Sequence, residues 1–226
     1  MMSELFDTLR ELKQDVMRNI VQLLSSEKAF ADLLDDKNSS TDIADKALAR
    51  VMTDNNDLFH YTTAIGYPFE TDHFMMSRYS DATYPVWYGA MEMMTTIHET
   101  AYHMMKRELG IEKIHHVDVI IRERIIYNVY CHGILIDLTR KKKFYTELVS
   151  ESHNKTQKIG KQIYQQGFPG LLAPSARYPK GINVNIFKHE ILSDPRVNCR
   201  LTYRMIPTLK KVEVFQRNRK LQEVML

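Results

Sequence analysis

The chain has 226 residues, of which 44% are hydrophobic and 26% are charged, a composition that excludes disordered and collagen-like proteins. The net charge of +3 is small and the basic residues are scattered, so no direct binding of nucleic acid is predicted. No apolar run approaches the roughly 18 residues of a membrane span, and the acidic N-terminus lacks the apolar core of a secretory signal. Cys131 and Cys199 fit two free thiols in a reducing compartment. We therefore expect a cytoplasmic protein that binds no membrane.

Residues 1–55 are predicted to form a helical extension that precedes the main domain. Apolar residues between Ser3 and Ser25 recur at steps of three and four, which is the spacing of one face of an amphipathic helix. They are Leu5, Leu9, Leu12, Val16, Ile20, Leu23 and Leu24. A second helix is expected from Asp42 to about Met52, capped by the hydroxyl groups that precede it. The extension carries no recognisable chemistry, and simple packing as a scaffold is the favoured role. Extension of the core, self-association and covering of a site are the alternatives.

Residues 56–226 are predicted to form one α+β domain, because strands and helices mix without a regular alternation of strand and helix. The expected strands are 59–63, 85–88, 117–127, 133–138, 170–173, 182–187 and the segment 197–215, which is interrupted at Pro207. The expected helices are 91–107 and 155–166, each followed by a glycine that can end it.

A zinc site on the first of these helices is excluded by geometry. Zinc-protease helices carry two histidines four residues apart, on one helix face. His98 and His103 are five residues apart, so about 140° of rotation separates them at 100° per residue. Glycine-rich phosphate loops and the nucleophile elbow of serine hydrolases are absent from the sequence as well. No metal site is predicted.

Three short segments instead combine polar and aromatic residues that a plain core does not need. They are Ser77-Arg78-Tyr79-Ser80, then Tyr84-Pro85-Val86-Trp87-Tyr88-Gly89, and finally Gly170-Leu171-Leu172-Ala173-Pro174-Ser175-Ala176-Arg177. The second segment leads into the helix that bears Glu99, a carboxylate among apolar neighbours.

The order and spacing of these residues resemble the RES-domain family, which is named after its Arg, Glu and Ser. Arg78 is followed by Tyr88, then by Glu99 on the next helix, and much later by Ser175 in a Pro-Ser-Ala-Arg segment. The resemblance covers roughly residues 58–190, and the Pro-Ser-Ala-Arg segment is its most specific piece. The family usually opens with an Arg-aromatic pair, whereas His60 stands in that arginine's place here. This departure leaves either a shifted register or a weakened anion contact.

The resemblance implies an ADP-ribosyltransferase-like mixed β core with flanking helices, and a chemistry directed at NAD. Glu99 would stabilise the positive charge that develops when the nicotinamide–ribose bond breaks. Arg78 would bind the pyrophosphate or an inorganic phosphate, and Ser175 would hydrogen-bond the nicotinamide ribose or the amide. The remaining residues expected to bind substrate are His60, Tyr61, Tyr79, Tyr88 and Arg177. NAD is expected as the substrate, with no separate cofactor.

The leading hypothesis is an NAD phosphorylase or glycohydrolase. Many members of the family are toxins that a helical, DNA-binding antitoxin holds inactive, so an antitoxin protein is the expected partner. A protein-directed mono-ADP-ribosyltransferase is one alternative, and a catalytically silent nucleotide-binding module, motivated by His60, is another. The sequence does not decide whether phosphate, water or a protein side chain accepts the ADP-ribose group. It does not decide either whether the protein forms a homo-oligomer.

Overall fold

The protein is represented by a computed structural model that describes residues 5–21, 60–111 and 114–226. The strands are β1 (Leu9–Val21), β2 (Trp87–Ala90), β3 (Ile120–Asp137), β4 (Gly170–Pro174), β5 (Ile182–Ile186), β6 (Leu192–Ile206), β7 (Lys211–Gln216) and β8 (Arg219–Met225). The two longer helices are α4 (Met93–Glu108) and α5 (Asn154–Gln165). The short helical turns include η2 (Thr62–Gly66).

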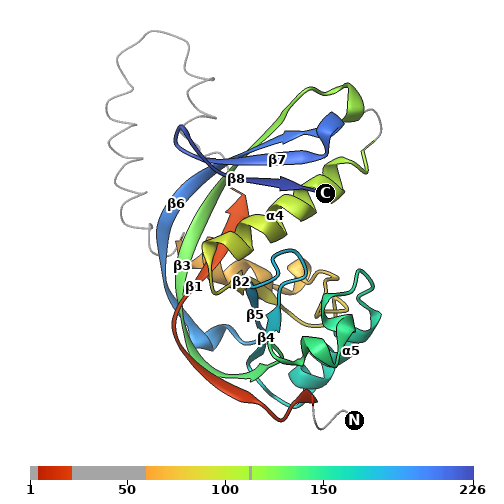
Figure 1. The fold of residues 1–226 in the computed structure, drawn as a ribbon. Coiled ribbons are helices and arrows are strands. Elements are labelled where there is room, and N and C mark those ends of the chain that lie inside the picture. Colours follow the sequence, from red (N-terminus) through yellow and green to blue (C-terminus); the bar gives the residue numbers. More distant parts are fainter. Residues whose placement is uncertain (1–4, 22–59, 112–113) are drawn as a thin grey trace, which may run out of the picture.

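The described strands form one mixed sheet in the order β1-β2-β5-β4-β3-β6-β7-β8, in which β1 also pairs with β3. β3 and β4 are parallel, and the other strand pairs are antiparallel. Long, curved β1, β3 and β6 run through the molecule, with α4 across one side and α5 near β4 (Figure 1). The α+β class expected from the sequence is confirmed.

The N-terminal segment departs from expectation, because Leu9–Val21 form the strand β1 and not an amphipathic helix. β1 pairs with β3 from Leu9 opposite Ile136 to Val21 opposite Arg124. Its buried side chains, Leu12 and Val16, are four residues apart, and that step fits both a helix face and alternate positions on a strand. The helix predicted over residues 42–52 lies outside the described residues.

Two further elements differ from the expected ones. His60 and Tyr61 begin a helical segment that continues into η2, although aromatic and β-branched residues favoured a strand here. The segment is held by packing, since Ile65 is buried and the Trp87 indole donates a hydrogen bond of 2.7 Å to the carbonyl of Ala64. The two strands expected over 117–138 are the single strand β3, which stays continuous because both β1 and β6 pair along it.

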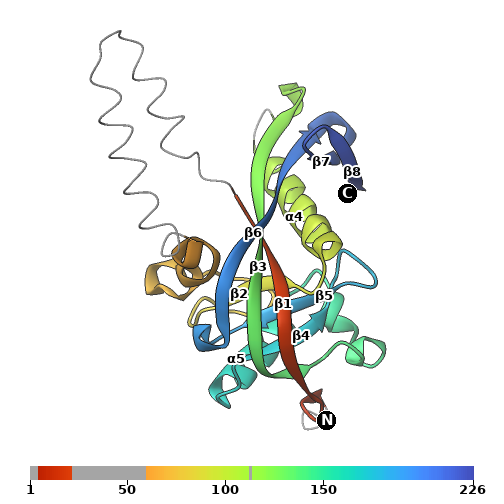
Figure 2. The same cartoon turned by 90° about the vertical axis from the view of Figure 1, so that its left-hand side faces the viewer.

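The core packs against both sides of the sheet and thereby positions α4. One cluster joins Ile97, Ala101 and Met105 of α4 to apolar residues of β3, β6, β7 and β8. A second gathers around Trp87 and η2, and a third lies between α5, β4 and Tyr84. The segment that follows residue 60 and the helix α4 lie on opposite sides of β3 and β6 (Figure 2). No helix in the described ranges is long and apolar enough to cross a membrane.

Candidate active site

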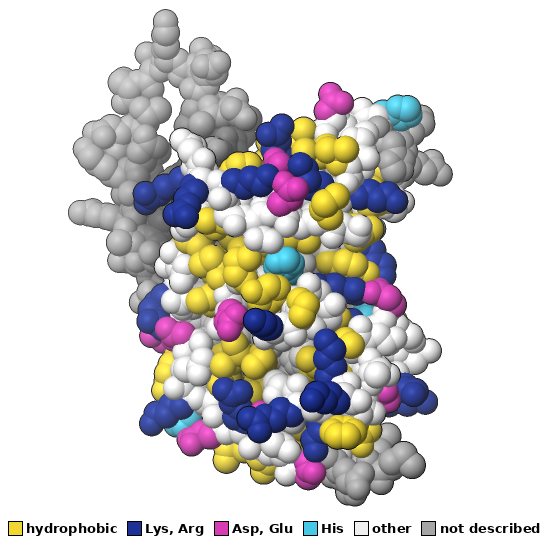
Figure 3. Space-filling model, in the orientation of Figure 1, with side chains coloured by type: hydrophobic (Ala, Val, Ile, Leu, Met, Phe, Trp, Pro, Cys, Tyr) yellow, Lys and Arg dark blue, Asp and Glu magenta, His cyan; other side chains and the backbone are white. Residues whose placement is uncertain are grey.

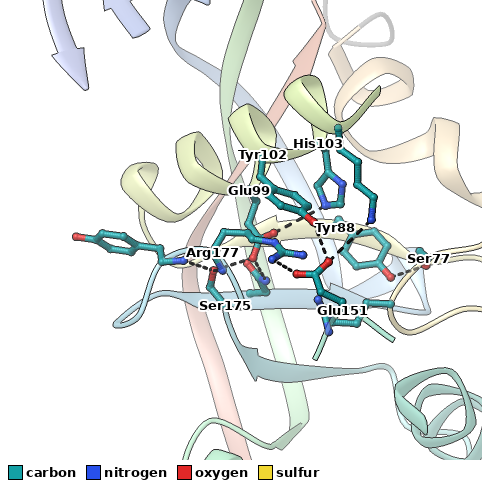
Figure 4. Close-up of polar contacts among 12 residues, drawn as sticks. Ser77, Tyr88, Glu99, Tyr102, His103, Glu151, Ser175 and Arg177 are labelled. Atoms are coloured by element: carbon teal, nitrogen blue, oxygen red, sulfur yellow. Dashed lines mark hydrogen bonds and ion pairs between the residues drawn. The ribbon is translucent and has the colours of Figure 1, made fainter. Parts of the chain in front are cut away.

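Glu99 stands at the centre of a hydrogen-bonded cluster between α4 and the ends of β4 and β5 (Figure 4). Its Oε1 atom accepts hydrogen bonds from Ser175 Oγ at 2.7 Å and from Asn183 Nδ2 at 2.8 Å. Its Oε2 atom lies 3.9 Å from His103 Nε2, and 21% of the Glu99 side chain is exposed. One carboxylate oxygen is therefore held by two donors, while the other stays available to a ligand.

Ser175 follows directly after β4 and is buried. Its hydroxyl donates to Glu99 and accepts hydrogen bonds from the backbone N–H groups of Arg177, at 3.1 Å, and Tyr178, at 2.9 Å. Its own N–H group donates to the carbonyl of Gly181 at 2.8 Å, which closes the loop between β4 and β5. A hydroxyl has one proton and two lone pairs, so these contacts use its whole capacity. Ser175 thus ties this loop to the Glu99 carboxylate.

A second group of side chains lies beside Glu99 and consists of Arg177, Tyr102 and Glu151, which contact one another (Figure 4). The Arg177 guanidinium donates to Glu151 and lies over the Tyr102 ring, with its carbon 3.4 Å from the ring centre. The Tyr102 hydroxyl donates to the other oxygen of Glu151 at 2.8 Å. The hydrogen bonds from Arg177 and Tyr102 lower the pKa of Glu151 to about 2. Arg177 Nε is buried and has no hydrogen-bond partner among the described residues.

Arg78 is anchored through the backbone of the segment that precedes α5. Its Nη1 atom donates to the carbonyl of Ser150 at 2.7 Å and reaches that of Leu148 at 3.4 Å. The positive charge of Arg78 also affects the pKa values of His103 and His153. Loss of hydration lowers the pKa of each ring, and the positive charge of Arg78 lowers both further.

Three cationic side chains act on His103, which lies beside the Glu99 carboxylate. The charges of Arg177, Arg78 and Lys106 all act on His103 in the direction that disfavours its protonation, against the opposite pull of Glu99. The face that Figure 3 shows carries Lys and Arg side chains more widely than Asp and Glu. Arg177 and Lys106 also contact the Glu151 carboxylate. Cationic groups near a carboxylate suit a ligand that is itself anionic but develops positive charge at one atom.

Tyr88 and Tyr79 sit close together but in different surroundings. Tyr88 as a whole residue is 36% exposed, and its hydroxyl donates to Ser77 Oγ at 2.6 Å and accepts from the backbone N–H of Tyr79 at 3.1 Å. Burial of the hydroxyl raises the pKa of Tyr88 to about 12. Tyr79 is buried in the cluster between α5 and β4, and its hydroxyl has no hydrogen-bond partner within the described parts of the chain. Tyr88 is therefore partly open to solvent, whereas Tyr79 belongs to the core.

The structure does not bring His60 and Tyr61 to Glu99. His60 Nδ1 lies 2.9 Å from the Tyr127 hydroxyl, and the two rings meet edge to face. Tyr127 shares its core cluster with Trp87, and η2 packs there through Ala64. Side chains alternate along a strand, so Trp87 and Tyr88 point to opposite faces of β2. His60 therefore lies across the sheet from Arg78, Tyr88, Glu99, Ser175 and Arg177, which share the other side.

Asn183, Tyr102, Glu151 and His103 are residues of this cluster that sequence reasoning missed. A signal for Asn183 was present, because Ile182-Asn183-Val184-Asn185-Ile186 alternates apolar and polar residues as a half-buried strand does. That alternation puts both asparagines on the face opposite Val184. Glu151 and Tyr102 carry no such pattern, and their contact with Arg177 depends on tertiary packing.

The described residues contain no group of three or more His, Cys, Asp or Glu side chains that could hold a metal ion. The two histidines near Glu99 also differ in their contacts. His98 stacks on Tyr178 with ring centres 4.9 Å apart, whereas His103 lies beside the Glu99 carboxylate. Because the two histidines are five residues apart on α4, their rings point in different directions from the helix axis and make different contacts.

Comparisons with known proteins place the chain in a family. The crystal structure of the M. tuberculosis MbcT-MbcA toxin-antitoxin complex aligns with a TM-score of 0.46 and 11% identity, over 89% of this chain and 88% of that one. No curated protein sequence matches. The model of the RES domain matches residues 47–206, more than half of the chain, and this range contains Arg78, Glu99 and Ser175. The chain therefore belongs to the RES domain family, as the motif resemblance indicated.

Proposed function

We propose that the protein cleaves the nicotinamide–ribose bond of NAD, with Glu99 as the catalytic carboxylate. The observation that carries the proposal is the asymmetric hold on Glu99. Its Oε1 atom accepts two hydrogen bonds, whereas Oε2 accepts none from the described residues and lies 3.9 Å from His103 Nε2. A carboxylate held in this way is preorganised to stabilise the positive charge on a ribose ring as nicotinamide departs.

The positive charges around Glu99 support the choice of an anionic substrate. Two backbone carbonyls hold the Arg78 guanidinium, and its charge acts on His103 together with the charges of Arg177 and Lys106. In the proposal these groups attract the pyrophosphate of NAD, and the exposed Tyr88 ring stacks on the nicotinamide or ribose. Ser175 takes the role of fixing Glu99, in place of the substrate contact expected from the family motif.

The same family membership supports a role as the toxin of a toxin–antitoxin pair, with an antitoxin protein as partner. Such a toxin should stop growth when it is expressed alone, because loss of NAD stops metabolism. Induced expression of the wild-type chain is expected to arrest growth, whereas cells that express Glu99→Gln are expected to keep growing. Arrest by both proteins would separate toxicity from NAD cleavage.

The direct test follows nicotinamide release from NAD by the purified protein, with and without inorganic phosphate. Release that requires phosphate indicates a phosphorylase, and release in its absence indicates hydrolysis. Glu99→Gln should lower the rate by about 100- to 1,000-fold, the scale of losing one preorganised electrostatic contact in the transition state. Glu92→Gln is the matched control, because Glu92 is an exposed glutamate at the start of the same helix.

The outcomes of this experiment separate the alternatives. Label from NAD that becomes attached to protein would point to a protein-directed ADP-ribosyltransferase. Binding of NAD without turnover would point to a silent nucleotide-binding module. Equal rates for the wild type and Glu99→Gln would contradict the assignment of Glu99.

A further inference from the structure

Asn183 holds the same carboxylate oxygen as Ser175 but does so from a different element. Its Nδ2 atom donates to Glu99 Oε1 at 2.8 Å from the strand β5. Ser175 donates to that oxygen at 2.7 Å from the loop that follows β4. Two donors that converge on one oxygen from separate elements fix both the position and the rotation of the carboxylate group.

The strand provides a firm base for this contact. Asn183 pairs with Ala90 of β2 on one side and with Ala173 of β4 on the other, so hydrogen-bonded neighbours flank its backbone on both sides. The next residue, Val184, is fully buried in the cluster around Trp87. The amide group of Asn183 is therefore placed by the sheet itself and does not depend on the loop that carries Ser175.

We propose that Asn183 is a positioning residue, which holds Glu99 Oε1 so that Oε2 faces the reacting ribose. The inference rests on the proposed function and deepens it. An amide suits this role because it donates a hydrogen bond without adding charge. An ionised carboxylate in the same place would repel Glu99 and offer no proton, so Asn183→Asp tests the hydrogen bond itself.

The kinetic test compares Asn183→Ala with the wild type in nicotinamide release. A misplacement of a reacting group by about 1 Å can cost about 100-fold in rate. We expect kcat to fall by about 10- to 100-fold while KM stays within about threefold, because Asn183 acts on Glu99 and not on bound NAD. Asn185→Ala is the matched control, since it removes the same amide group from the same face of β5, two residues away. It should destabilise the strand and leave kcat within about threefold.

Asn183→Asp adds a readout that a merely structural role would not change. A protonated carboxylic acid can donate a hydrogen bond as the amide does, whereas an ionised one cannot. Relative to the wild type at each pH, the activity of Asn183→Asp should therefore be lowest at neutral pH and should rise as the pH is lowered. A constant ratio across pH would contradict the hydrogen-bond role.

Thermal unfolding supplies a measurement that does not depend on activity. If the two side chains interact, the changes in Tm for Glu99→Ala and Asn183→Ala should not add in the double variant. Additive changes would overturn the inference, and so would a wild-type kcat for Asn183→Ala in an enzyme that needs Glu99. A wild-type protein that releases no nicotinamide would overturn the proposed function itself, whatever the unfolding data say of the contact.

Discussion

The two faces of β2 carry similar residue types but use them in different ways. On the Trp87 face, Arg18 lies over the indole ring at 5.1 Å, and His60 is bound to the Tyr127 hydroxyl. On the Tyr88 face, Glu99 is held at one oxygen and leaves the other available. Polar and aromatic residues therefore do not by themselves mark a site. The Tyr88 face differs from the Trp87 face in holding an acid at one oxygen only.

Ser175→Ala should have a large effect on both activity and stability, because the hydroxyl serves Glu99 and two backbone N–H groups at once. Loss of this support is expected to lower kcat by about 10- to 100-fold. Leaving these partly buried N–H groups without an acceptor should cost about 1 kcal/mol in the free energy of unfolding. Steady-state kinetics and urea denaturation measure the two effects. A variant with a raised KM and an unchanged kcat would instead favour direct substrate contact by Ser175.

His60→Phe tests the opposite face. The variant loses the contact with the Tyr127 hydroxyl and should be destabilised by about 1 kcal/mol. Its rate of nicotinamide release should stay within about threefold of the wild type, because His60 lies across the sheet from Glu99. A loss of activity on the scale of Glu99→Gln would show that the Trp87 face takes part in the reaction.

Arg18→Met should leave activity unchanged and stability unchanged or improved. Burial lowers the pKa of Arg18 to about 9, and its Nε and Nη1 atoms have no hydrogen-bond partner among the described residues. Replacing a buried charge with an apolar side chain of similar length is often neutral or stabilising, by about 1–4 kcal/mol at most. Thermal unfolding checks this, and a marked loss of Tm would show that the guanidinium contributes more through the Trp87 ring than its desolvation costs.

Glu151→Gln should produce a small effect that depends on pH. The folded-state pKa of Glu151 is about 2, below the ordinary 4.5, so its ionised form stabilises the fold above pH 4.5. That contribution should be lost as the pH falls from 4.5 toward 2. Its size should stay below about 1 kcal/mol, because 62% of the side chain is exposed to solvent. The Tm difference between the wild type and Glu151→Gln should thus be constant near neutrality and shrink in acid.

The sequence predicted much of the α+β domain and the residues around Glu99. Alternation and glycine positions located β2, α4, α5, β4 and β5 to within a few residues. The family motif led to Arg78, Glu99 and Ser175, which the fold brings to one side of the sheet. The predicted elements agree with the structure where local pattern and tertiary structure agree, whereas the roles of the three site residues stay a prediction.

The misses have physical causes. Leu12 and Val16 are four residues apart, a step that helix and strand share, so the periodicity of β1 did not separate the two. Pairing with β3 decided the outcome, and a pairing partner more than a hundred residues away leaves no local trace. His60 was expected near the substrate because of its place in the motif, but the packing of η2 against Trp87 carries it to the other face.

The most direct test is a crystal structure of Glu99→Gln soaked or co-crystallised with NAD, because the variant should bind NAD and turn it over only slowly. We predict that the nicotinamide ribose lies within hydrogen-bonding distance of the side chain at position 99, with the pyrophosphate toward Arg78 and Arg177. NAD bound instead on the face of Trp87 and His60 would contradict the assignment of the site.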